Sequence, residues 1–487
     1  MRNLFLVILA VLTIFSQIIQ FRNAKGTTAS GLPYITWVTD PHPSRPAQIR
    51  GFREWLKSHG HADIEVKLDT ANTGLQKILI QSATGVAADI MQVGDAVPFL
   101  AQTGMVEDLD DVAKTFGINE SELFESSRDD LFVGGHRYGA AKNISMELYF
   151  VNLDLFQKLG LSPPPSRWDF DTFERIGVEF DRKANAGKKR RTIFFASRTS
   201  PEILRKSAGL STFNETLTAC ALDKPEYQDL LNRMKRWTME EHIVPSDSDR
   251  ADLAVGQGYG EAFFQLFNNN QAGMLLSGRW SLIQIRAMER NPNMSAVELP
   301  NGGFPCTIAG AHGLVLYKGS KKKELSRYFF AYLMSEDYSM QILKDVDSLP
   351  PLKKFMDRDE FLKPKGFANE WPAHAAFRKA ALEIAVGREF SPFIISSVLA
   401  RIEGRRYQSF ITGIDTAKDM TRLLREEVDA EIAKQVKRSP ELHENYRKRF
   451  ERQKEIDALK AAGKKIPLDL IDNPFLKKYY AATGKGV

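Results

Sequence analysis

The sequence is poor in the residues and motifs that build metal, nucleotide and covalent catalytic sites. Its 487 residues include two cysteines, Cys220 and Cys306, and eight histidines that show no metal-ligand spacing. It contains no His-Glu-x-x-His, no phosphate-binding loop and no Gly-x-Ser-x-Gly. The glycines at positions 256, 258 and 260 are not a dinucleotide fingerprint, because no predicted strand runs straight into them. We therefore expect no metal, no cofactor and no catalytic residue.

The sequence also lacks a large excess of charge of one sign. Lysine and arginine total 67, aspartate and glutamate total 61, and the formal net charge is +6. A nucleic-acid-binding protein would need a concentrated basic stripe. The charged segment after Arg401 alternates basic and acidic residues, which is typical of a solvated helix face. We expect no nucleic-acid partner, and we expect a monomer.

Length and composition favour a soluble protein with more than one domain. A chain of 487 residues is too long for a single core. Hydrophobic residues make up 43% and charged residues 26%, which is ordinary for a globular protein. The two cysteines lie far apart in sequence and could pair in an oxidising compartment, but we favour two buried free thiols.

An apolar run near the N-terminus predicts export. Arg2 precedes Leu4–Ile19, which fits either the core of a signal peptide or a short membrane anchor. An Ala-x-Ala spacing is absent just after it, and no cysteine is present there for a lipid anchor, so we favour an uncleaved anchor. Residues 20–32 have the composition of a tether. Either interpretation predicts a periplasmic or cell-surface protein whose residues 1–32 stand apart from the globular part.

An alternation of strands and helices follows. Ile35–Val38, residues 64–68 and Ala88–Val93 are predicted strands. Helices are predicted between them, one beginning near Pro46 and one with a capping box at Thr73. This order implies right-handed crossovers and a parallel sheet that helices cover on both faces.

Polar residues follow the first and third predicted strands. Thr39 and Asp40 come after the first strand, and Asp95 after the third. In such sheets ligands lie beyond the carboxyl ends of the strands, so we expect these side chains at the edge of a cleft. Aspartate is also a good helix cap, and this alternative stays open for Asp40 and Asp95.

The pattern of the segment Arg137–Phe173 predicts that the chain crosses here from one compact unit to another. Ser145–Val151 is extended, and a helix follows with Asn152 placed to cap it and Gly160 to end it. Three consecutive prolines come next, and then a second helix capped by Asp169. This pattern resembles the hinge crossing of the sugar-binding, maltose-binding-like family of solute-binding proteins that serve ATP-binding-cassette importers.

Further segments resemble the same family in order and distance. Residues 84–111 are similar to its acidic segment, in which the position of Asp95 binds sugar hydroxyls. Residues 302–355 are similar to the family segment in which the chain crosses back into the first lobe and out again. Residues 413–420 are similar to the start of the family's terminal helix. Gly258–Ile285 is similar to its helix-strand-turn signature, although Asn270 and Gly273 depart from it. The matching residues of that signature are Phe267, Ala272, Met274, Gly278 and Trp280.

The resemblance covers about residues 33–435 and implies a fold and a domain organisation. The fold class is α/β, a two-lobed periplasmic-binding-protein fold of type II, with a mostly parallel sheet flanked by helices in each lobe. Residues 441–487 lie beyond the resemblance and are expected to form a peripheral helix with a flexible end. The expected lobes are discontinuous: 33–142 with 307–355 for the first, and 143–306 with 356–440 for the second.

The resemblance further implies that the protein catalyses nothing. It would close two lobes around a mono- or oligosaccharide and deliver it to a membrane permease of an ATP-binding-cassette importer. Trp280 matches a position that stacks on sugar, although packing between helix and sheet is its alternative. Trp37 and Trp168 are expected to be core residues. The expected ligand-binding residues are Thr39, Asp40, Asp95, Asn143, Ser145, Glu147, Arg279, Trp280, His312 and Trp371.

Two other classes of function stay open at this point. One is a carboxylate-pair glycosidase, which needs two carboxylates roughly 5–10 Å apart. A membrane-tethered adaptor without a solute would apply if side chains fill the cleft. Glu147, expected on the floor of the site with Asn143 and Ser145, has a solvated charge as its alternative.

Overall fold

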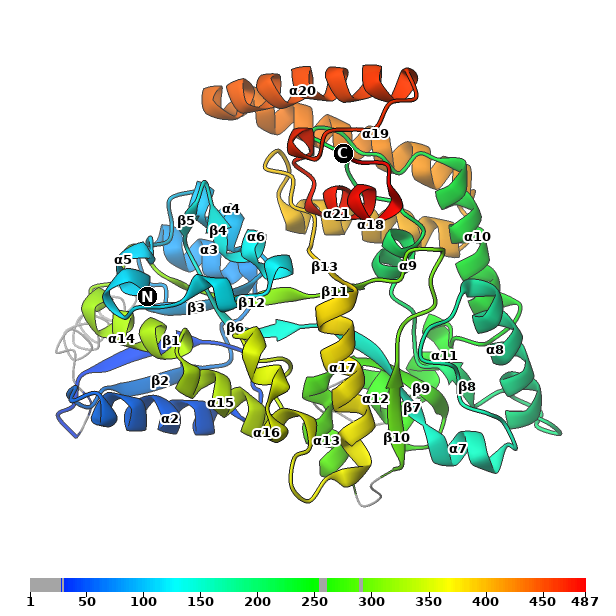
Figure 1. The fold of residues 1–487 in the computed structure, drawn as a ribbon, viewed down its shortest axis with the longest axis horizontal. Coiled ribbons are helices and arrows are strands. Elements are labelled where there is room, and N and C mark those ends of the chain that lie inside the picture. The colour runs from blue at the N-terminus through cyan, green and yellow to red at the C-terminus, as the bar shows by residue number, and fades with distance from the viewer. Residues whose placement is uncertain (1–27, 29, 254–260, 289–291) are drawn as a thin grey trace, which may run out of the picture.

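The structure, a computed structural model, describes residues 28, 30–253, 261–288 and 292–487 (Figure 1). The apolar run Leu4–Ile19 and the glycines at 256, 258 and 260 lie outside these residues. Among the helices of the described part, none combines the length and the apolar character needed to cross a membrane.

The first sheet has five strands in the order β2-β1-β3-β12-β6. Strand β1 pairs in parallel with β2 and β3, as predicted. Strand β12 lies between β3 and β6 and is antiparallel to both. A strand from the predicted return segment therefore completes the sheet that the N-terminal part begins. The bounds are β1 Tyr34–Val38, β2 Glu65–Asp69, β3 Ile90–Gly94, β6 Ala140–Ser145 and β12 Gly310–Leu316.

Helices cover both faces of this sheet. Ile90 and Met91 are neighbours on β3 but belong to different core clusters, because successive side chains of a strand point to opposite faces. Helices α2, α14 and α15 contribute to the first cluster, and α3 and α4 to the second. The bounds are α2 Arg45–Ser58, α3 Leu75–Ala83, α4 Val97–Gln102, α14 Lys323–Leu333 and α15 Glu336–Asp345.

Two predictions about helix starts are settled by these bounds. Helix α3 begins after Gly74, which makes no side-chain cap, so the predicted capping box at Thr73 is wrong. The N-cap residues of α2 and α4 are Ser44 and Ala96, so neither predicted aspartate caps a helix. The smaller elements that follow are α5 Asp110–Thr115, η1 Glu120–Glu122, η2 Glu125–Ser127, α6 Arg128–Leu131, β4 Phe132–Val133 and β5 His136–Arg137.

The second sheet has four strands in the order β10-β7-β9-β8. Strand β9 is antiparallel to β7 and parallel to β8, and β10 is antiparallel to β7. Asn152 and Asp169 cap α7 and α8 by accepting hydrogen bonds from backbone amides, as predicted. The bounds are β7 Glu147–Asn152, β8 Phe194–Ala196, β9 Ala272–Gly278, β10 Met294–Val297, α7 Leu153–Lys158, α8 Phe170–Ala184, α9 Pro201–Ser207, α10 Pro225–Met239, α11 Asp247–Leu253, α12 Glu261–Asn268, η3 Arg279–Ser281 and α13 Leu282–Arg286.

The core residues of both sheets agree with several expectations from the sequence. Trp37 and Trp168 are buried. Cys220 and Cys306 are buried free thiols. Gly160 follows α7 with φ of 61°, a conformation that suits glycine at a helix end.

Two single-residue segments connect the first sheet to other strands. Met146 separates β6 from β7 of the second sheet, and Ala309 separates β12 from β11, which belongs to a separate two-stranded sheet. Strand β11 pairs in parallel with β13, which leads from α17 toward the C-terminal helices. Helix α17 packs against β10 (Figure 1). The bounds are β11 Thr307–Ile308, η4 Lys353–Asp357, α16 Asp359–Leu362, η5 Ala368–Glu370, α17 Trp371–Glu383 and β13 Ala385–Val386.

The C-terminal part is ordered and packed on the second lobe (Figure 1). Helix α19 agrees with the terminal helix expected there. The expectation of a flexible end is wrong, because Ile466 pairs with Gly486 and the side chains of Ile466 and Phe475 are buried in the second-lobe core. The bounds are α18 Ser396–Ile411, α19 Ala417–Arg438, α20 Pro440–Ala461, η6 Leu468–Leu470 and α21 Pro474–Thr483.

Candidate functional site

A cavity of about 780 Å³ lies between the first lobe and the C-terminal helices. Its first-lobe side is formed by the residue after β3, by α4 and by the α6–β4 region. This is the carboxyl edge of β3, where ligands are expected in α/β sheets. The residues that matter most on this side are Asp95, Phe99, Gln102, Asp129 and Phe132.

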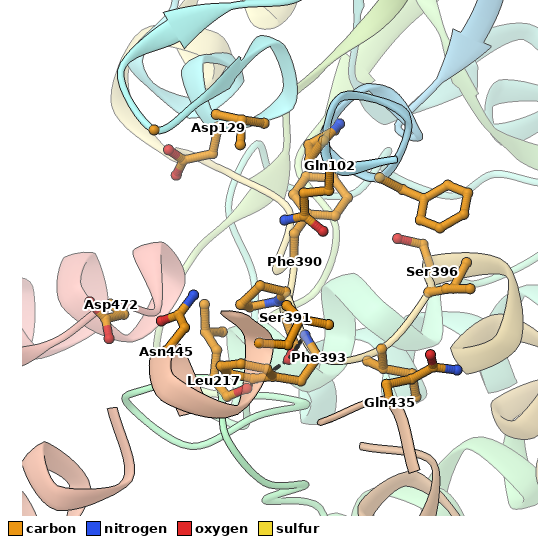
Figure 2. A pocket seen from close by; sticks show the side chains of 18 of the residues that line it. Gln102, Asp129, Leu217, Phe390, Ser391, Phe393, Ser396, Gln435, Asn445 and Asp472 are labelled. Atoms are coloured by element: carbon orange, nitrogen blue, oxygen red, sulfur yellow. Dashed lines mark hydrogen bonds between the residues drawn. The ribbon is translucent and has the colours of Figure 1, made fainter. Parts of the chain in front are cut away.

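The opposite side of the cavity comes from much later in the chain. The segment 388–396, which follows β13, supplies Arg388, Phe390 and Phe393. Helices α19 and α20 supply Gln435 and Asn445. Figure 2 shows Gln102 and Asp129 on the first-lobe side, Ser391, Gln435 and Asn445 on the other, and Phe390 between them.

The lining combines aromatic faces with polar groups that have unused hydrogen-bonding capacity. Its aromatic side chains are four phenylalanines, two on each side. Within the described part of the chain, Asp95, Gln102 and Asp129 have no hydrogen-bond partner for their side chains. A concave site with apolar area and a few polar groups is the usual form of a small-molecule site, and volumes of roughly 300–1,000 Å³ are typical.

One ion pair joins Arg388, which lines the cavity, to Asp130 behind it. Arg388 Nη1 is 3.5 Å from Asp130 Oδ2, which also accepts a hydrogen bond from the Ala311 amide at 2.5 Å. Burial raises the pKa of Asp130 to about 7, and the nearby Asp95 and Asp129 carboxyls act in the same direction. Arg388 therefore faces a carboxyl group that takes up a proton near neutral pH.

Asp129 itself is at the exposed rim of the cavity. Partial removal from water raises its pKa, and Arg128 partly opposes this shift. Carboxyl groups in such surroundings accept hydrogen bonds from hydroxyl groups when ionised. The first-lobe side of the cavity thus offers carboxyl oxygens and an amide to a polar solute.

Thr39, Asp40 and Asn143 meet in a separate polar cluster at the same edge of the first sheet. Asp40 accepts hydrogen bonds from Arg45 at 2.7 Å and from Lys142 at 2.5 Å. Burial alone would raise the pKa of Asp40, but the two cations hold it well below its usual range. The predicted acceptor Asp40 is therefore already saturated by protein partners.

The same cluster extends to a loop from the return segment. Asp347 accepts hydrogen bonds from Arg45 at 2.7 Å and from Asn143 at 2.8 Å, and all three side chains are buried. Thr39 Oγ1 donates to Gln92 at 2.5 Å. Burial lowers the pKa of Lys142 to about 8. This network ties β6, α2 and the residue-347 loop together beside the lobe crossing.

Ser145, Glu147 and His312 lie at the crossing itself. Ser145 ends β6 and Glu147 begins β7. Glu147 pairs with Arg198, and each side chain is 28% exposed. His312 lies on β12, and burial lowers its pKa to about 3, which keeps it neutral. The crossing is polar, but Glu147 has a cationic partner.

Arg279, Trp280 and Trp371 do not line the cavity. Arg279 is fully buried, donates to the Ser348 carbonyl at 3.0 Å and to His374 Nδ1 at 3.2 Å, and burial lowers its pKa to about 9. Trp280 is partly buried, with its ring against Gly278. Trp371 is 39% exposed at the first residue of α17.

Of the ten residues predicted from the sequence, Asp95 is the one that lines the cavity. Sequence reasoning missed the segment 388–396 and the C-terminal helices. A usable signal for the segment was present, because Phe390 and Phe393 stand among Arg388, Glu389 and Ser391 in the short stretch directly after α17 and β13. Nothing local in α20 marks Asn445 as a cavity residue.

Comparison with known proteins agrees with this architecture. The family described as bacterial extracellular solute-binding protein matches residues 54–373, which is more than half of the chain. A protein of Brucella abortus (strain 2308), named as a binding protein, is 24% identical over 305 residues that cover 59% of this chain and 68% of that protein.

Solved structures show the same fold. An ABC substrate-binding protein from Listeria monocytogenes, in complex with cycloalternan, is 20% identical and has a TM-score of 0.69, covering 82% of this chain and 99% of its own. UgpB from Mycobacterium tuberculosis, in complex with glycerophosphocholine, is 16% identical and has a TM-score of 0.65, covering 83% of this chain and 100% of its own. The predicted two-lobed α/β fold is confirmed. The chain belongs to the bacterial extracellular solute-binding proteins.

Proposed function

We propose that the protein binds a saccharide in the 780 Å³ cavity and delivers it to the permease of an ATP-binding-cassette importer. The observation that carries this proposal is the lining, in which four phenylalanine rings stand among carboxyl and amide groups with unused hydrogen-bonding capacity. Sugar rings have apolar C–H faces that aromatic area removes from water, and hydroxyl groups that carboxylates and amides bind. The structural neighbour from Listeria monocytogenes holds a saccharide, which supports this choice.

The proposed mechanism is a two-state closure of the lobes. The short crossings at Met146 and Ala309 are the hinges of a rigid rotation. A solute that contacts both sides of the cavity favours the closed form by its differential affinity for that form. Ser145 and Glu147, which lie at the crossing, are proposed to contact the solute in the closed form. The permease then recognises the closed surface, and no catalysis is part of this cycle.

The proposed location is outside the cytoplasm. Membership in an extracellular family supports export. The apolar run Leu4–Ile19 supports either a signal peptide or an uncleaved anchor that tethers a monomer to the cytoplasmic membrane, with residues 20–32 as the tether.

A thermal-shift screen with neutral and acidic sugars tests the proposal, because a ligand that binds the folded state raises the melting temperature by mass action. Hits are then titrated by calorimetry, and the mixtures are analysed by chromatography. We expect saturable binding and unchanged sugar. Product formation would instead support a glycosidase that uses Asp95 and Asp129, and the absence of any shift across the screen would refute sugar binding.

A further inference from the structure

One wall of the cavity is built by helices near the C-terminus. This C-terminal wall consists of residues from the end of α19 and the first half of α20, and the family match ends at residue 373, well before it. Figure 2 shows Gln435 and Asn445 on this side of the cavity. The members of the C-terminal wall are Gln435, Ser439, Leu442, Asn445 and Arg449.

Two amides of the wall have one hydrogen-bonding group engaged and one open. Arg449 Nε donates to Asn445 Oδ1 at 3.0 Å, and the Asn445 Nδ2 donor has no partner among the described residues. Gln435 Nε2 donates to Glu431 Oε1 at 2.6 Å, and the Gln435 Oε1 acceptor likewise has no partner in the described part. The wall therefore offers an open donor and an open acceptor, and each can bind a sugar hydroxyl group, since a hydroxyl both accepts and donates.

The wall is held rigidly on the second lobe. Gln453 of α20 accepts hydrogen bonds from the amide and hydroxyl of Thr216 at 3.1 and 2.9 Å and donates to Glu215 at 2.8 Å. All three residues are buried, as is Ile456 one turn further along α20. Binding groups fixed in this way lose little conformational entropy when a ligand arrives.

The C-terminal extension also fixes the aromatic segment of the cavity. The side chain of Glu389, next to Phe390, is 2% exposed and accepts hydrogen bonds from Lys206 at 2.5 Å and from Asn473 at 2.9 Å. Asn473 also donates to Ser211 at 2.9 Å and caps α21. Residues from 435 onward thus supply the wall itself and, through Asn473, help to hold the segment that carries Phe390.

The charges around the cavity disfavour an anionic solute. Asp95 and Asp129 stand on the first-lobe side. Two arginines line the opposite side, and both have protein partners. Arg388 donates to the Ala311 carbonyl at 3.3 Å and lies 3.5 Å from Asp130, and Arg449 is 3.5 Å from Asp472, whose carboxylate also pairs with Arg452 at 2.8 Å. An acidic sugar would place its carboxylate near two carboxyl groups and would find both arginines already engaged.

We propose that the C-terminal wall selects neutral oligosaccharides of two or more rings. One ring lies against Phe390 and the Asp95 side, and a further ring reaches the open Asn445 donor and Gln435 acceptor. A cavity of 780 Å³ has room for several rings. This inference rests on the proposed sugar-binding function.

The test uses the full chain and calorimetry with maltotriose, cellotriose and mannotriose, their monosaccharides glucose and mannose, and trigalacturonate. The variant Asn445→Asp keeps the oxygen that accepts from Arg449 but removes the Nδ2 donor, and Gln435→Ala removes the acceptor. The control Lys448→Ala changes a side chain on α20 that is 66% exposed and outside the cavity. Melting temperatures of all variants report whether they fold.

We expect at least one neutral trisaccharide to bind the wild type more tightly than its monosaccharide, and trigalacturonate to bind most weakly. Each wall variant should lower the affinity for that trisaccharide about fivefold, which corresponds to the loss of one hydrogen bond. The affinity for the monosaccharide should stay unchanged. Equal effects on the trisaccharide and its monosaccharide, no effect, or tight trigalacturonate binding would overturn the role of the wall while sugar binding stands. If no sugar of the panel binds the wild type, the proposed function fails with it.

Discussion

Replacing Asp130 by asparagine tests whether a buried carboxyl behind the cavity titrates near neutral pH. Its pKa is raised from 3.8 to about 7, with burial as the largest cause, and its side chain is 1% exposed. The folded chain therefore holds this proton between about pH 4 and pH 7, whereas the unfolded chain releases it. Because the folded state binds more protons in this window, its stability falls as pH rises through it.

The size of the effect follows from the shift. One pKa unit corresponds to about 1.36 kcal/mol, so a shift of about three units costs the wild type about 4 kcal/mol above pH 7 relative to pH 4. The variant Asp130→Asn cannot ionise, and its amide oxygen can still accept from the Ala311 amide. We expect the difference in unfolding free energy, variant minus wild type, to rise by about 2–4 kcal/mol between pH 4.5 and pH 8.

Urea unfolding at several pH values measures this difference. Subtracting the wild-type curve from the variant curve removes the contributions of the other titrating groups. The control Asp111→Asn removes an exposed carboxylate of the same lobe and serves as the reference for the loss of one surface charge. A flat difference for Asp130→Asn would refute the reasoning, because it would mean that Asp130 is ionised throughout this range.

Three further outcomes follow from the site and its supports. Phe390→Ala should weaken binding of the sugar identified by the screen by about 1.5–3 kcal/mol in calorimetry, the worth of burying a phenylalanine, whereas Phe450→Ala, on α20 outside the cavity, should not. Lys206→Met should lower the unfolding free energy by about 3–5 kcal/mol in urea titrations, because it leaves Glu389 buried without its main cation; a loss below 1 kcal/mol would contradict this. Solution scattering should show a smaller radius of gyration on adding the bound sugar, and an unchanged radius would count against lobe closure.

Much of the fold was predictable because its signals are local. The caps at Asn152 and Asp169, and the strands that contain Ile35 and Ile90, depend on neighbours a few residues away in the chain. The order of these elements then limits the possible topologies to a few. The error at Thr73 shows the limit, since helix starts are decided by backbone geometry as well as by residue type.

Much less of the candidate site was predictable. Asp95 was found because the carboxyl edge of a parallel sheet is a topological feature. Asp40 and Arg279 have the right chemistry for a ligand, but distant residues occupy them: Lys142 in the first case, and Ser348 with His374 in the second. Which polar groups remain open depends on partners far away in sequence.

The sequence by itself determined the alternation of strands and helices, the crossing near Met146 and, through its similarity to known proteins, the family. Tertiary structure alone decided the binding surface. Asn445 faces the cavity because buried contacts such as those of Gln453 and Ile456 hold α20 against the second lobe, and Phe390 is held in place through Glu389. These contacts join residues more than 80 positions apart, and burial decides which charges are paired and which groups stay open.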